Sequence, residues 1–100
     1  MVEISTDELV GKRVVTPDGR NVGSLSEVRV DPEEWNVAGL VIALENQAAD
    51  ELRLKTPMMG KAELEISPRR VQGVGDYVTL NVSVPELRDL VESARAGPAR

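Results

Sequence analysis

The side chains that could carry chemistry in this chain are mostly carboxylates, because it contains no cysteine and no histidine. Without cysteine there is no thiolate to act as a nucleophile or metal ligand. Without histidine, the commonest general base and the commonest metal ligand are both missing. The sequence therefore excludes Ser-His-Asp catalysis, Cys-His catalysis and structural zinc sites.

Two groups of carboxylates remain as candidates for acid–base or metal chemistry. Asp31, Glu33 and Glu34 lie within four residues, but they lack the twelve-residue loop pattern that supplies about six oxygen ligands to a hard cation. Glu63 and Glu65 alternate along an expected strand and so share one face, but no pocket-forming or oxyanion-stabilising residues accompany them. We interpret the first group as a solvated turn and the second as an exposed acidic face. We predict no enzymatic activity, no cofactor and no bound metal.

Composition limits the kinds of partner. The net charge of −5 argues against unspecific binding to phosphate backbones, and two aromatic residues, Trp35 and Tyr77, are too few for a base-stacking platform. No apolar run approaches the length of a membrane span, and the acidic N-terminus does not resemble a signal peptide. We expect a cytoplasmic protein of one domain over residues 1–100, with its core at about 5–94 and a flexible tail at 95–100.

The first half of the chain predicts a bent sheet. Ser5 and Glu8 have capping-box spacing before a single helical turn. Strands are expected over 12–16, 21–30 and 35–44, and Pro17-Asp18-Gly19 forms the tight turn between the first two. The valine alternation of the second strand slips beside Gly23, which indicates a bulge there. Asp31-Pro32 ends this strand.

The second half predicts a short helix at about 47–52, a loop over 55–61 and a half-exposed strand over 62–66. A helical turn at 67–70 precedes a strand or strand pair over 71–82. Residues 83–96 form the clearest helix, capped by Ser83 and Glu86. The fold class is mainly β: a small barrel of five to six strands with a short linker helix and a C-terminal helix. The expected core residues are Val14, Val22, Leu25, Val28, Val30, Val37, Leu40, Ile42, Leu64, Ile66, Val71, Val78 and Leu80.

Several residues are candidates for contact with a partner, each with a structural alternative. Trp35 either anchors an interface or packs at a hairpin end. Met58 and Met59 either form an adaptable contact surface or plug a barrel mouth. Arg69 and Arg70 either recognise an acidic partner or form a solvated basic turn. The stripe at helical spacing either covers its own barrel or packs across a dimer two-fold axis; its members are Leu87, Leu90, Val91 and Ala94.

The ordered pieces of the chain resemble the PRC-barrel family over about residues 5–92. The pieces are Leu9-Val10-Gly11-Lys12-Arg13-Val14, Asp18-Gly19, Val22-Gly23, Val30-Asp31-Pro32 with Trp35 and Val37, Pro57 and Gly60, and Val71 to Val78 before Leu80. The linker Ala48–Lys61 and Val84-Pro85-Glu86-Leu87 look like the small stand-alone archaeal branch.

This resemblance implies a five- to six-stranded barrel, often dimeric, that serves as a docking module without catalytic residues. Similar domains occur in a ribosome-maturation factor, in a photosynthetic reaction-centre subunit and in archaeal cell-division adaptors. Those adaptors bind the protein that anchors FtsZ to the membrane. We therefore expect a homodimeric adaptor whose partner is that anchor protein. The alternative is a factor associated with ribosomes or RNA processing, against which the acidic charge counts.

Overall fold

The computed structural model describes the backbone of residues 3–96 and the side chains of residues 3–93. Six strands form one strongly bent sheet in the order β4-β3-β2-β1-β6-β5. In chain order the elements are α1 (Thr6–Leu9), β1 (Arg13–Val15), β2 (Asn21–Asp31), β3 (Asn36–Leu44), α2 (Asn46–Glu51), β4 (Glu63–Ile66), the 3₁₀ turn η1 (Pro68–Arg70), β5 (Val71–Val74), β6 (Tyr77–Leu80) and α3 (Val84–Ala96). The mainly β class is confirmed.

The sheet is not closed by hydrogen bonds into a full barrel, which corrects that part of the expectation. Its edge strands are β4 and β5. They are consecutive in the chain, and the turn η1 joins them directly. Pro68 begins this turn and has no N–H to donate to a ladder. The gap between the two edges is therefore spanned by a turn.

Local sequence signals place most elements correctly. Ser5 and Glu8 form the expected capping box of α1, and Ser83 and Glu86 form the corresponding pair before α3, where the Ser83 N–H donates to Glu86 Oε1 at 2.8 Å. The register between β1 and β2 shifts beside Gly23, as predicted. A second shift lies between Leu25 and Glu27 in the β2–β3 pair, so the apolar alternation changes phase again between Leu25 and Val28.

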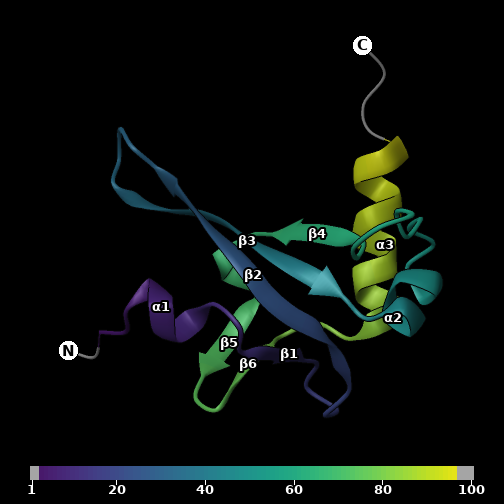
Figure 1. Cartoon of the computed structure of the whole chain (residues 1–100), viewed down its shortest axis with the longest axis horizontal. Helices are drawn as coiled ribbons and strands as arrows, with labels where there is room; N and C mark the ends of the chain where they lie inside the picture. Colours follow the sequence, from purple (N-terminus) through teal and green to yellow (C-terminus); the bar gives the residue numbers. More distant parts are fainter. Residues whose placement is uncertain (1–2, 97–100) are drawn as a thin grey trace.

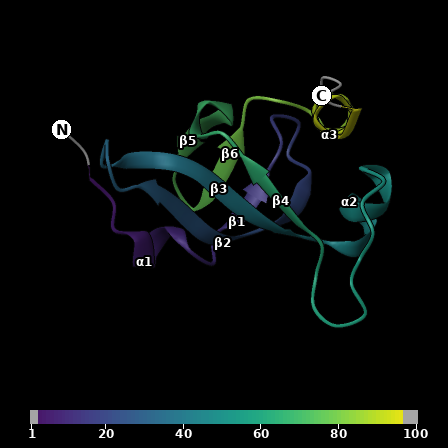
Figure 2. The ribbon, with the colours of Figure 1, turned by 90° about the horizontal axis from the view of Figure 1, so that it is seen from above.

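The core lies between the inner face of the sheet and the two helices α2 and α3. These helices lie together at one end of the molecule (Figure 2). The predicted strand residues Val14, Val22, Leu25, Ile42 and Leu80 are buried. The expected core list omitted Leu44 at the end of β3 and the helical and linking residues Ala48, Ala49, Leu52, Ala62, Val82 and Val84. Leu87 is also in the core, which agrees with one of the two alternatives given for the stripe.

Two predicted core residues, Val30 and Val37, are wrong: they are 48% and 41% exposed. β1 pairs with β2 only as far as Ser24, and β4 pairs with β3 only from Leu40 onward. Residues 29–39 therefore form a two-stranded hairpin that projects beyond the rest of the sheet (Figure 1). We call this segment the arm. The apolar residues of the arm alternate as in a half-buried strand pair, but neither β1 nor β4 extends alongside it.

Candidate docking surfaces

The tip of the arm presents Trp35 to solvent. Asp31 organises the turn: its Oδ1 accepts hydrogen bonds from the N–H groups of Glu33 at 2.8 Å and Glu34 at 3.3 Å. The Trp35 N–H then donates to the Asp31 carbonyl at 2.7 Å. Trp35 has φ 57°, in the left-handed region, and is 79% exposed. It does not pack at the hairpin end, so this alternative does not hold.

The backbone at Trp35 is strained for its residue type. The left-handed region suits glycine and asparagine, and a bulky residue there is an outlier that costs on the order of 1–3 kcal/mol. Such strain persists only where the surroundings or a function require it. Because the indole is exposed, the cost is not offset by packing in this chain.

An apolar groove lies at the base of the arm, and the sequence reading missed it. It has a volume of about 260 Å³, and every residue that lines it is apolar, among them Ile4, Val37, Leu40, Pro68, Val71 and Val74. Ile4, Val37 and Val74 are each exposed. We call this the arm-base groove. Its residues come from four separate segments, so no local sequence pattern could have revealed it.

Met58 and Met59 lie in the connection between α2 and β4, which extends away from the sheet (Figure 2). Met58 is fully exposed and Met59 is 88% exposed. Neither side chain plugs a barrel mouth. Two adjacent exposed thioethers form a flexible apolar surface of the kind found at adaptable protein contacts.

Arg69 and Arg70 belong to η1, which Ser67 caps by accepting the Arg69 N–H at 3.2 Å. Arg69 is exposed and Arg70 is half-buried. Arg70 lines an apolar groove of about 230 Å³ between β4 and α3, together with Glu65 and other residues. The pKa of Glu86 is lowered, first by the backbone and side-chain hydrogen bonds from Ser83 and further by the charge of Arg70.

The apolar stripe of α3 divides between the core and this groove. Leu87 is 1% exposed and belongs to the core of its own chain. Leu90 is 36% exposed, and with the half-buried Val91 it lines the β4–α3 groove. Ala94 lies outside the residues whose side chains the structure describes. The surface of α3 left for a partner is therefore smaller than the sequence stripe suggests.

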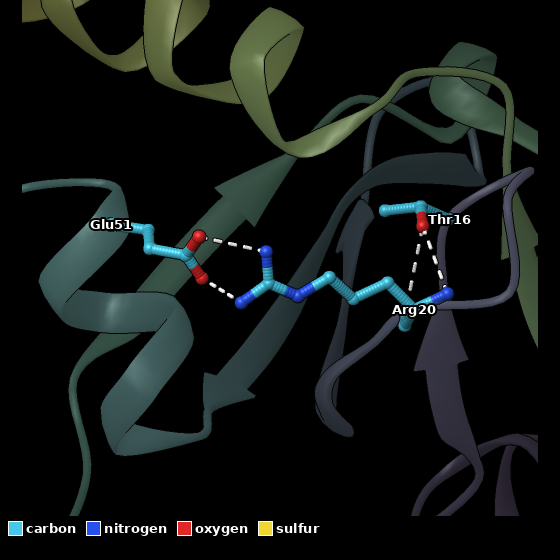
Figure 3. A network of polar contacts seen from close by, with 3 residues as sticks. All are labelled: Thr16, Arg20 and Glu51. Atoms are coloured by element: carbon cyan, nitrogen blue, oxygen red, sulfur yellow. Dashed lines mark hydrogen bonds and ion pairs between the residues drawn. The ribbon is translucent and has the colours of Figure 1, made fainter.

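Polar contacts beside α2 have a structural role. Arg20, which follows the β1–β2 turn, forms a two-pronged ion pair with Glu51 of α2 (Figure 3), in which Nη1 donates to Oε2 at 2.7 Å. Asn21 Nδ2 donates to Glu45 Oε1 at 2.8 Å. Thr16, buried beneath the turn, accepts the Arg20 N–H at 3.1 Å. These contacts attach α2 to the turn.

The carboxylates that the sequence marked as candidates do not form an acid–base or metal site. Glu65 and Glu27 each lie within ion-pair distance of Arg29, at 3.5 and 3.3 Å, and Asp31 caps its own turn. Within residues 3–93, three or more acidic side chains do not gather in an arrangement that could hold a metal ion. No helix in the described part of the chain is long and apolar enough to cross a bilayer.

A bent six-stranded sheet with surface grooves and projecting apolar side chains has the features of a small β-domain of the protein-interaction type. The family model for the PRC-barrel domain matches residues 1–84, and the chain belongs to this family. PRC-barrel domains are generally non-catalytic modules. A comparison with curated proteins finds no significant match to this chain.

Proposed function

We propose that this PRC-barrel domain is a homodimeric adaptor that joins two proteins and catalyses no reaction. The observation that carries the proposal is the exposure of its largest flexible and aromatic apolar side chains, Trp35, Met58 and Met59, on two segments that project from the core. Tryptophan and methionine are both enriched at protein interfaces relative to the rest of the surface. Arginine and tryptophan are also enriched at the centres of interfaces.

We assign the different partner to the Met58–Met59 loop. Met58 and Met59 offer apolar area that can adapt to a partner's shape. A partner with an apolar patch of its own would match this loop.

The proposed process is archaeal cell division in the cytoplasm, with the protein that anchors FtsZ to the membrane as the partner. This rests on the family resemblance of the linker Ala48–Lys61 and of Val84-Pro85-Glu86-Leu87. The acidic charge and the two aromatic residues favour this proposal over a role with ribosomes or RNA.

The experiment is a binding titration of the purified chain against the purified FtsZ-anchoring protein from the same organism. Met59→Asp should weaken binding about tenfold or more, since it places a charge in an apolar contact. Thr56→Asp is the matched control, because it adds the same charge to an exposed position of the same loop. Equal binding by both variants would remove the loop as the contact.

The alternative is tested with the same preparation. A gel shift of ribosomal RNA that weakens steeply as salt increases would support the ribosome-associated role. The adaptor proposal predicts no shift at physiological salt. Failure of the wild-type chain to bind the anchor protein, together with such a shift, would overturn the cell-division assignment.

A further inference from the structure

The apolar inner face of the sheet continues past the core onto the arm. Val28 pairs with Leu40 and Val30 pairs with Val37. Val28 and Val30 alternate along β2, and a register shift between Arg29 and Val30 inserts one extra residue between Val37 and Leu40 on β3. Val28 packs against the core, whereas Val30 and Val37 are exposed. Val37 also lines the arm-base groove. Arm and groove therefore form one continuous apolar surface that no part of the described chain covers.

We propose that the same surface of a second copy covers this one, with the two arms antiparallel and each Trp35 seated in the arm-base groove of the other copy. The inference rests on the homodimer proposed above and names its interface. It places that interface on the arm, whereas the sequence pattern had suggested α3. The groove is incomplete without the second copy, because its aromatic occupant comes from that copy.

The positions of Trp35 and the groove suit a two-fold axis. Trp35 lies at the tip of the arm, and the groove lies at its base, where Val37 and Leu40 line it. When two identical arms lie side by side in opposite directions, each tip reaches the other's base. Both contacts then form together, and the assembly closes as a dimer without leaving a free site for filament growth.

The tip of the arm is acidic, and one cation, Arg69, lies beside the groove. Residues 30–38 contain Asp31, Glu33 and Glu34 but no lysine or arginine. Arg69 directly follows Pro68, which lines the groove. Arg69 is exposed, and among the residues with described side chains it makes no ion pair. An acidic tip from a second copy would therefore meet an available cation.

The other apolar groove fits this tip less well. The groove between β4 and α3 is lined by Glu65 as well as Arg70. The charge of Arg70 also contributes to the lowered pKa of Glu86, which therefore lies near it. Glu65 and Glu86 therefore place negative charge beside this groove. A tip that carries Glu33 and Glu34 would meet like charge there.

The strained backbone at Trp35 indicates that tryptophan is present for a contact outside its own monomer. Asparagine would occupy φ 57° more readily, and the turn itself depends on the Asp31 carboxylate and backbone. Trp35 therefore costs the monomer stability without packing against it. Burial of the indole in the groove of a second copy supplies the offsetting contact.

The test is sedimentation equilibrium of the full chain over a wide concentration series. Trp35→Asn should raise the dimer dissociation constant about 30-fold or more, equivalent to about 2 kcal/mol at 1.4 kcal/mol per tenfold. Unfolding of the dilute variant, followed by circular dichroism, should show a midpoint equal to or above that of the wild type. Met59→Asn, at an exposed position away from the arm, is the matched control and should leave the constant unchanged.

A second pair of variants tests the charge match. Arg69→Glu should weaken the dimer, and Glu34→Arg in the same chain should restore part of the loss. A wild-type chain that stays monomeric overturns both the arm interface and the homodimer. A dimer that survives Trp35→Asn but is lost in Leu90→Asp overturns the arm interface alone and leaves the homodimeric adaptor standing.

Discussion

Gly23 shows how one residue determines the curvature of the sheet. A Cβ at this position would collide with the carbonyl oxygen of Ala43 on the neighbouring strand, and φ is 156°. Because glycine has no side chain, β2 can approach β3 closely at Gly23 and bend there, where it pairs with β1 on one side and β3 on the other. The sequence indicated the irregularity here from the slipped valine phase, but the neighbour that requires glycine could be identified only from the structure.

Gly23→Ala should therefore destabilise the domain by about 1–3 kcal/mol, the usual cost of forcing an extra carbon into a packed position. Chemical denaturation measures the loss. Gly73→Ala in β5 is the matched control, because nothing lies within 4 Å of a Cβ placed there. Equal effects of the two substitutions would contradict the role given to Gly23.

Two carboxylates, Asp18 and Glu86, make the free energy of unfolding depend on pH. The pKa of Asp18 is held below its ordinary value of 3.8, first by the hydrogen bond from the Thr16 hydroxyl. The pKa of Glu86 is held below 4.5 by the hydrogen bonds from Ser83. Because both folded-state values are depressed, their stabilisation is complete above the unfolded-state values and is lost as pH falls through the folded ones.

The double variant Asp18→Asn, Glu86→Gln should consequently lose less stability than the wild type when the pH is lowered from 6 to about 3. The unfolding midpoint in urea, measured at each pH, gives the comparison. Parallel pH profiles for the two proteins would show that these carboxylates have ordinary pKa values in the folded state.

At the scale of elements, the sequence patterns predicted the positions of the helices and strands well. They predicted less well which faces of these elements are buried. Period and caps identified α3, but the packing of Leu87 against its own core depends on the position of that helix beside the sheet. Ala48 and Ala49 gave no strong apolar signal, yet both are buried where α2 meets the sheet. The exposure of Val30 and Val37 depends on how far the neighbouring strands extend, which local alternation does not encode.

The two leucines of α3 offer a direct check of this placement. Leu87→Ala should cost about 2–5 kcal/mol of unfolding free energy, as usual for a buried leucine. Leu90→Ala, three residues further along the same helix, should cost less than about 1 kcal/mol. Both values come from denaturation at a concentration where the chain is monomeric. A larger loss at position 90 than at 87 would contradict the orientation of α3.

At the scale of the whole molecule, the proposed dimer surface lies far from the helices α2 and α3. The helices α2 and α3 lie at one end of the sheet and the arm at the other (Figure 1). The family and the β class could be predicted from the ordered motifs. The arm-base groove could not, because its walls come from α1 and the segment before it, from the arm, and from the chain around β5 and β6. The contact surface therefore becomes visible only when the chain is folded.

Trp35 itself reports most directly on whether the arm is a contact surface, because it is the only tryptophan in the chain. The measurement is iodide quenching of its fluorescence in dilute and in concentrated samples of the wild-type protein. Docking of the arm predicts strong quenching when dilute, and weaker quenching with a blue-shifted emission when concentrated. Quenching that stays strong at every concentration, in a sample shown by sedimentation to contain dimer, would contradict the account.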